Sequence, residues 1–340
     1  MHLIRKIEAG ARSFYASKAV VRFKIAMKTL KTYSLCIMMA ASLVTMANAM
    51  PLNSSARSVV PAEVQQLISV DYRAIKDSPT AMQLKQQLMP DNIKEFEGAL
   101  RGVGIDPDKD VDTLAFAAFR TAKNGTKAVG VAAGPFAMKA VIKKMTLRKI
   151  KPTKYRTSNI YPMDGGLVMV FLDDSTLLFG EVGAVKQALD TRDGLTMSMD
   201  TNSTMADMMS DVDSGPVWSI LDQQGTQNVM RSALGDAAKV ADYDTIKKRL
   251  LGSRYTMNFN SGVNFDLTVV TSDGMSASML SSAVNLGILA KKMSASAVEK
   301  IAIENTNVVS DGSNVQFHFK SNDQQFQSLM HSELFAAVSH

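Results

Sequence analysis

One stretch, residues 167–190, limits the fold most strongly, because two apolar runs, a turn and an amphipathic segment follow one another there. Residues 167–171 are all apolar, which is typical of a strand covered on both faces, or covered on one face and shielded at the rim. The triplet Asp173-Asp174-Ser175 favours a turn, and residues 176–179 resume the apolar run. Beyond Gly180 the apolar residues recur at helical spacing. The stretch therefore predicts a hairpin that leads into a helix, which is half of an α+β layer.

Elements of these kinds recur along the chain in an order that is found twice. Residues 50–195 predict a strand, two helices, two strands, a helix, two strands and a helix, and residues 214–340 predict the same order. Segment 196–213, rich in Ser, Thr, Asp and Met, is the expected linker. We therefore predict an α+β fold of two tandem modules of order β-α-α-β-β-α-β-β-α, with antiparallel sheets and helices packed on one face. Residue identity between the halves is negligible, so the internal duplication rests on element order alone.

Turn and cap signals mark the expected boundaries. Lys123-Asn124-Gly125 favours a hairpin turn, because Asn-Gly suits a positive φ angle, and Ser261-Gly262 and Asp311-Gly312 join the strand pairs expected in the second module. Ser78-Pro79 is a helix start with a hydroxyl cap before proline. Ser321 and Gln324 have the spacing of a capping box and predict the start of a last helix.

Residues 1–49 have the features of a leader. A basic start at Met27 precedes a short apolar run at residues 35–46, and Ala47 and Ala49 are the small residues that signal peptidase accepts. We predict cleavage after Ala49, and an uncleaved anchor is the alternative. The protein is then exported, to the periplasm or the cell exterior.

The segment ahead of Met27 and the single cysteine qualify this prediction. Residues 1–26 are basic and nearly free of acidic residues, so they are either an upstream start with Met27 as the true one, which we favour, or a transit peptide. Cys36 lies within the apolar run rather than after it, which argues against a lipoprotein. The mature chain has no thiol, so it has no disulfide, cysteine metal site or cysteine nucleophile.

Charge gives no support for nucleic-acid binding. The chain has 38 basic and 32 acidic residues, and the leader holds eight of the basic ones and one of the acidic ones. From Met50 onward 30 basic residues face 31 acidic ones, so the high pI belongs to the leader. Peripheral contact with a membrane through exposed Met and Leu side chains is kept as an alternative.

The histidines of the mature chain do not form a recognisable catalytic or metal motif. His318 shares a strand face with Gln316 and Lys320, a pattern typical of a solvent-facing position, while His331 lies on the last expected helix and His340 ends the sequence. The sequence has no H-x-x-x-H pair for zinc and no G-x-S-x-G elbow for a serine nucleophile.

Two further segments resemble metal-binding sites, but a structural role explains each of them better. Residues 106–112 place carboxylates at alternate positions, but Val111 stands where a calcium loop needs glycine and Ala117 where it needs a bidentate acid. The linker methionines could ligate Cu(I) through thioethers, but methionine is also a flexible core filler. We therefore expect no cofactor. No Walker loop or complete dinucleotide motif is present. The linker methionines are Met197, Met199, Met205, Met208 and Met209.

Several short stretches resemble a loosely defined set of exported bacterial proteins of unknown function. They lie within residues 59–193, and the resemblance implies duplicated α+β modules without a reaction, ligand or catalytic residue. The stretches are Val60-Pro61-Ala62, Gly104-Ile105-Asp106-Pro107, Gly134-Pro135-Phe136 and Phe179-Gly180-Glu181-Val182.

Three hypotheses follow from the sequence. The first is a non-catalytic exported protein that binds an unidentified ligand or envelope protein through a sheet surface or the cleft between modules. The second is a periplasmic enzyme that uses carboxylates, for which Asp164, Asp173 and Asp174 are the candidates, although paired acids at a turn are usually turn formers. The third is an envelope-associated structural protein.

Overall fold

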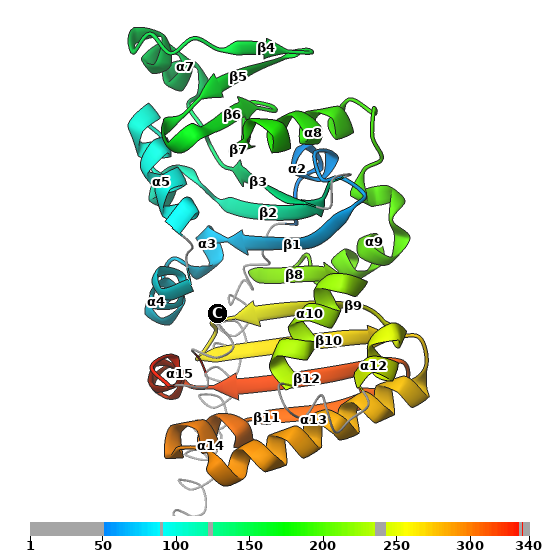
Figure 1. Cartoon of the computed structure of the whole chain (residues 1–340). Coiled ribbons are helices and arrows are strands. Elements are labelled where there is room, and N and C mark those ends of the chain that lie inside the picture. Colours follow the sequence, from blue (N-terminus) through cyan, green and yellow to red (C-terminus); the bar gives the residue numbers. More distant parts are fainter. Residues whose placement is uncertain (1–50, 89–90, 122–124, 235–242, 333–334, 336–340) are drawn as a thin grey trace, which may run out of the picture. The chain divides into compact units, whose positions relative to one another are not determined.

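A single antiparallel sheet organises the computed structural model, which describes residues 51–340 except 89–90, 122–124, 235–242, 333–334 and 336–340 (Figure 1). Residues 51–340 belong to one compact unit. The predicted leader, with Met27, Cys36, Ala47 and Ala49, lies outside the described residues. From edge to edge the strands are β11 (Thr306–Asp311), β12 (Asn314–Ser321), β10 (Val263–Thr271), β9 (Leu250–Asn258), β8 (Val217–Asp222), β1 (Val64–Asp71), β2 (Thr113–Arg120), β3 (Thr126–Ala133), β7 (Thr176–Glu181), β6 (Leu167–Phe171), β5 (Ser158–Pro162) and β4 (Thr153–Tyr155).

The two segments predicted as modules meet in the middle of this sheet. The first strand of each, β1 and β8, pair antiparallel with Leu67 opposite Ile220. The α+β class is therefore confirmed, but the expectation of separate sheets is wrong. Each of these strands covers the hydrogen-bonding edge of the other, so neither is left as an exposed edge. We call β1 to β7 the N-terminal sheet half and β8 to β12 the C-terminal sheet half.

The helices connect these strands in an order close to the predicted one. In the first segment they are α2 (Ser54–Ser58), α3 (Tyr72–Ile75), α4 (Pro79–Leu88), α5 (Asp91–Val103), α6 (Pro107–Asp110), α7 (Met138–Leu147), η1 (Asp164–Gly166) and α8 (Val182–Arg192), and in the predicted linker they are η2 (Met199–Thr201) and α9 (Ser203–Ser210). In the second they are α10 (Gln223–Leu234), α12 (Tyr243–Ile246), η3 (Lys247–Arg249), α13 (Gly274–Ser294), α14 (Ala297–Glu304) and α15 (Asp323–Met330). Strand β4 and helices α2, α3, α6 and α14 were not expected.

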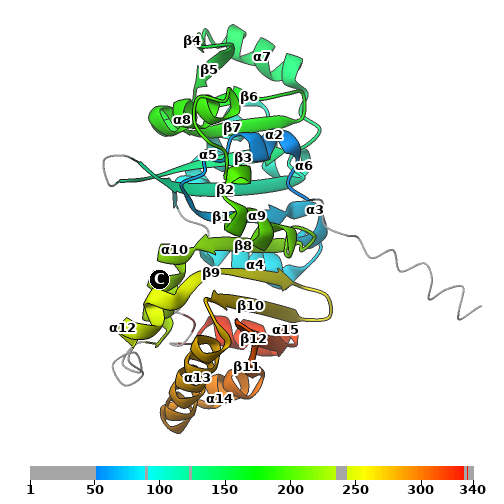
Figure 2. The same cartoon turned by 90° about the vertical axis from the view of Figure 1, so that its right-hand side faces the viewer.

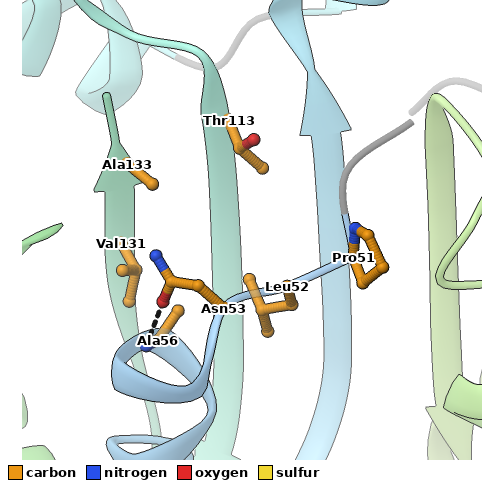
Figure 3. Close-up of a pocket in the computed structure, with 7 residues that line it drawn as sticks. All are labelled: Pro51, Leu52, Asn53, Ala56, Thr113, Val131 and Ala133. Carbon is orange, nitrogen blue, oxygen red and sulfur yellow. Dashed lines mark hydrogen bonds between the residues drawn. The ribbon is translucent and has the colours of Figure 1, made fainter. Parts of the chain in front are cut away.

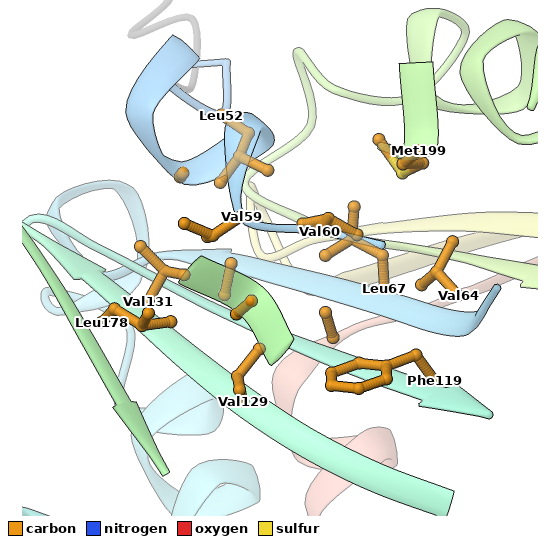
Figure 4. Packing of buried hydrophobic residues seen from close by; sticks show 14 of the residues in the cluster. Leu52, Val59, Val60, Val64, Leu67, Phe119, Val129, Val131, Leu178 and Met199 are labelled. Atoms are coloured by element: carbon orange, nitrogen blue, oxygen red, sulfur yellow. The ribbon is translucent and has the colours of Figure 1, made fainter. Parts of the chain in front are cut away.

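The N-terminal sheet half is covered on both faces, contrary to the expectation of helices on one face. Successive strand residues point to opposite faces, so neighbouring Leu178 and Phe179 define the Leu178 face and the Phe179 face. On the Leu178 face a core cluster joins the strands to α2, α8 and α9. Figure 4 shows the part of this cluster around Leu52, Val131 and Leu178. On the Phe179 face a second cluster joins them to α5 and α7. The reason is the apolarity of β6 and β7 at nearly every position, which requires burial of both faces.

The C-terminal sheet half is covered mainly on the Phe179 face. There α10, α12 and α13 form one cluster around Val269 and Val315, and α4 and α15 form another around Val263 and Phe319. On the Leu178 face α9 contacts this half, over β8 and β9. Helices α13 and α14 lie at the β11 end of the sheet (Figure 2).

The predicted linker contributes to the core. Segment 196–213 contains η2 and α9, and four of its five methionines are buried in the Leu178-face cluster, whereas Met197 is 70% exposed. Burial of the thioethers among apolar side chains accounts for these methionines as core fillers. The four are Met199, Met205, Met208 and Met209.

One predicted helix start is shifted by one residue. The capping box of α15 uses Asn322 and Gln325 rather than Ser321 and Gln324. Ser321 is instead the last residue of β12 and pairs with Val263. The amide of Asn322 accepts the same backbone hydrogen bond as a serine hydroxyl would, so both residues fit a helix cap by chemistry.

Candidate functional site

The open side of the C-terminal sheet half is the candidate site. Strand register places residues that lie directly opposite on the same face, and a row of such residues crosses four strands on the Leu178 face: Thr256, Asp266, His318 and Asn307. The row on one side adds Arg254, Thr268 and Gln316, and the row on the other side adds Asn258, Asn264 and Lys320. We call these ten residues the polar face. All ten are partly or fully exposed.

Hydrogen bonds hold several of these side chains in place. His318 Nδ1 lies 2.7 Å from Asp266 Oδ1, and the two side chains are 48% and 50% exposed. Asn264 Nδ2 donates to Asn258 Oδ1 at 3.0 Å. Arg254 Nη2 lies 3.0 Å from Oδ2 of Asp211, the residue that ends α9. The polar face therefore presents amides, hydroxyls and both signs of charge in fixed rows.

The polar face offers hydrogen-bonding groups to a partner. The described hydrogen bonds of His318 include a carboxylate but no serine, so the pair lacks the nucleophile of a hydrolytic triad. Donors and acceptors spread over a sheet surface can instead pair with the polar groups of a partner. Sequence reasoning placed His318 with Gln316 and Lys320 correctly, but it did not find Asp266, which lies 52 residues away.

The carboxylates suggested for an enzyme do not converge. Asp164 lies in η1 before β6, and Asp173 and Asp174 lie after it, so a five-residue strand of about 16 Å separates them. Asp173 Oδ1 accepts from the backbone N–H of Ser175 at 2.7 Å. Hydrogen bonds from Ser55 and Ser175 lower the pKa of Asp173 although its partial burial opposes this. Asp173 is therefore a charged turn former.

The segment resembling a calcium loop is held together by its own caps and ion pairs. Asp106 accepts from the backbone N–H of Asp108 as the cap of α6, and a hydrogen bond from Lys109 lowers its pKa. Asp108 lies 3.0 Å from Arg101, and Asp112 lies 3.3 Å from Arg73. Within the described ranges no group of three or more His, Cys, Asp or Glu side chains could hold a metal ion.

The remaining histidines do not add to the site. His331 is exposed and ends α15, where its backbone N–H bonds to the last turn. His340 lies outside the described residues.

Two hollows in the described structure are small. One encloses about 20 Å³ beside α2, where Asn53 Oδ1 accepts from the Ala56 N–H (Figure 3). The other, between α5 and α7, measures about 160 Å³ and includes Lys144 and Asp110 in its lining. Small-molecule sites usually measure about 300–1,000 Å³, so the open sheet is the stronger candidate.

Comparison with known proteins gives limited similarity. Neither a protein-family model nor a curated protein matches this sequence. The solved structure titled "Structure of crystal form I of TP0453" is 8% identical with a TM-score of 0.43, and covers 84% of this chain and 97% of its own. Crystal form III of TP0453 is 7% identical with a TM-score of 0.42, and covers 84% and 98%. These scores do not define a common fold.

None of the helices in the described part of the chain combines the length and the apolarity that a bilayer span requires.

Proposed function

We propose that this protein is a non-catalytic binding protein that uses the polar face to hold a ligand or a protein partner. One observation carries the proposal: the Leu178 face is buried under α2 and α8 in the N-terminal half, whereas in the C-terminal half, beyond the contact of α9 with β8 and β9, the described residues leave the polar face partly or fully exposed. The open rows combine Asp266, His318, Lys320 and Arg254 with amides, a mixture that can match a polar surface of mixed charge.

We propose further that the protein works outside the cytoplasm after cleavage following Ala49. The basic start at Met27, the apolar run and the small residues at Ala47 and Ala49 support export. A ligand or protein of the cell envelope is then the expected partner. Peripheral contact with a membrane remains part of this proposal.

The two segments also support the proposed internal duplication. Strands β1-β2-β3-β7-β6 and β8-β9-β10-β12-β11 follow the same order on the two sides of the central pair. Hairpin β4–β5 is an addition to the first segment. We propose that the second copy kept the strand order while its Leu178 face became polar and available for binding.

The proposal is tested by native mass spectrometry of the protein purified from its own host. We expect an additional mass on the wild type that is lost from Asp266→Lys/Gln316→Lys, because both substitutions change charge on the polar face. The matched control is Gln86→Lys/Gln87→Lys, which changes two exposed residues of α4. The intact mass also shows whether the chain begins at Met50.

Two results would contradict the binding proposal. One is a wild type that carries no additional mass. The other is an additional mass that both double variants retain equally, which would place the binding site elsewhere.

A further inference from the structure

A second surface, on the outside of α13, is apolar where a surface helix is normally polar. Ala277, Leu280 and Val284 of α13 are buried against the sheet. The opposite side nevertheless exposes five large apolar residues, which are between 44% and 84% exposed: Met275, Met279, Leu286, Leu289 and Met293. From Gly274 to Ala290 the helix has no charged residue. Charge depletion and enrichment in Met are features of the core of protein interfaces.

The spacing of these residues indicates what covers them. With exposed Ser282 they are separated by four, three, four, three and four positions. This is the alternation of a coiled-coil seam, which is suited to packing against another helix. We call the six residues the α13 seam. Ser278 and Ala290 beside the seam are exposed and small, so they allow a partner helix to approach closely.

We propose that the α13 seam packs against the α13 seam of a second copy of this chain, antiparallel across a two-fold axis. The spacing is the same read in either direction, as a symmetric contact requires. Antiparallel pairing places Met275 opposite the partner's Met293 and Met279 opposite the partner's Leu289. Ser282 then faces the partner's Leu286, so the smallest seam residue meets a large one at the centre.

The charges at the two ends of α13 favour the antiparallel direction. Exposed Lys291 lies at the C-terminal end, beside Lys292, which pairs with Glu304 at 2.8 Å. At the N-terminal end Asp273 pairs with Arg249 at 2.8 Å. Gly274 lies there against the carbonyl of Gly312, so the turn that contains exposed Asp311 is close by. Antiparallel pairing brings the basic end of each helix, with Lys291 and Lys292, toward the end of the other copy that carries Asp273 and Asp311, whereas parallel pairing would bring the two basic ends together.

The test measures oligomeric state by sedimentation velocity over a dilution series of the purified protein. We expect a wild-type dimer that dissociates on dilution, because one helix face gives a small interface. Leu286→Lys is expected to stay monomeric at every concentration. Leu147→Lys is the matched control, since Leu147 at the end of α7 is 75% exposed and lies outside the seam. A monomeric wild type, or a dimer that survives Leu286→Lys, would overturn the proposal.

Cross-linking tests the direction of pairing. In a Cys36→Ser background, Met275→Cys/Met293→Cys is expected to form a disulfide-linked dimer under oxidation, whereas neither single variant does. In an antiparallel pair the two copies of one residue lie about 27 Å apart, far beyond the reach of a disulfide. Cross-linking by a single variant would instead show parallel pairing.

A vesicle assay distinguishes a lipid occupant from a second copy. Wild type and Leu286→Lys are mixed with vesicles of phosphatidylcholine and phosphatidylglycerol and separated by flotation. We expect the two proteins to distribute alike, because the α13 seam is covered by a second copy. A wild type that is monomeric in solution and floats, while Leu286→Lys does not, would assign the α13 seam to a membrane surface and overturn the proposed dimer.

Discussion

The two halves of the sheet differ in what lies on the Leu178 face. One row of directly opposite residues crosses the sheet on that face, and it is apolar in β6, β7, β3 and β2 but polar in β9, β10, β12 and β11. The row is Val170, Leu178, Val131, Ala115, Ser69, Trp218, Thr256, Asp266, His318 and Asn307. One continuously hydrogen-bonded sheet can therefore be covered on both faces at one end of a row and on one face at the other end. The composition of each strand determines where helices must cover it.

The largest expected effect comes from placing a charge in the apolar part of this row, compared with the same charge at its polar end. Leu178 is fully buried under helices, so Leu178→Lys should lower the free energy of unfolding by more than about 5 kcal/mol, since a buried unpaired charge is among the costliest substitutions. Asn307 is exposed, and Asn307→Lys should change the free energy by no more than about 0.5 kcal/mol. Circular dichroism during denaturant unfolding measures both.

Equal stability of these two variants would contradict the comparison. A folded Leu178→Lys with the wild-type midpoint would show that the Leu178 face of the N-terminal half is open. Loss of structure in Asn307→Lys would show that the polar face is covered.

The sequence predicted the elements well and their assembly poorly. Periodicity located β6, β7, α8 and α13, because alternation and helical spacing are local signals. It did not predict that β1 and β8 pair, since any exposed strand edge can accept another strand. It placed His318 on a polar strand face but not beside Asp266, because register between β10 and β12 is a tertiary property.

A second comparison concerns ion pairs in the two halves. Lys85 Nζ lies 2.8 Å from Glu97 Oε1 between α4 and α5, where the side chains are only 13% and 12% exposed. The Lys85 ammonium also lies 4.5 Å from the centre of the Tyr72 ring, and burial raises the pKa of that tyrosine. Lys85→Met leaves the Glu97 carboxylate largely buried, with Arg101 at 3.7 Å as a more distant partner, so it should cost up to about 3 kcal/mol.

The double variant separates loss of the pair from loss of packing. Lys85→Met/Glu97→Gln should recover much of the stability, because it leaves no unpaired charge. Denaturant unfolding of both variants against wild type gives the comparison. A double variant as unstable as Lys85→Met would show that the stem of Lys85, rather than its charge, supports the contact between α4 and α5.

Acid should weaken the cap of α13 in the C-terminal half. The backbone N–H of Ser276 and the hydroxyl of Ser272 donate to Asp273, and with Arg249 they hold the pKa of Asp273 well below its ordinary value. When folding lowers the pKa of a carboxyl, the ionised carboxyl stabilises the folded protein. This stabilisation is complete above the pKa of the unfolded protein, about 4, and it is lost as the pH falls from there through the pKa of the folded protein. Wild type should therefore lose stability below about pH 4.

Two substitutions isolate the charge at this cap. Asp273→Asn and Asp273→Ser both keep an acceptor for the backbone but remove the titrating group. Both should show a smaller loss of stability than wild type when denaturant unfolding at pH 7 is compared with that at pH 3. Parallel pH dependence in all three proteins would mean that other carboxyls dominate the acid response.

The smallest effect is expected from the pair on the polar face. His318 and Asp266 are about half-exposed, and even fully charged pairs in such surroundings couple by about 0–1 kcal/mol because water screens them and their side chains lose entropy. A double-mutant cycle of His318→Gln and Asp266→Asn at pH 7 should therefore give a coupling energy below about 1 kcal/mol, in contrast to the buried Lys85–Glu97 pair. A coupling of 3 kcal/mol would show that the pair is sheltered. Low coupling together with loss of the co-purified mass would mean that these side chains serve binding rather than folding.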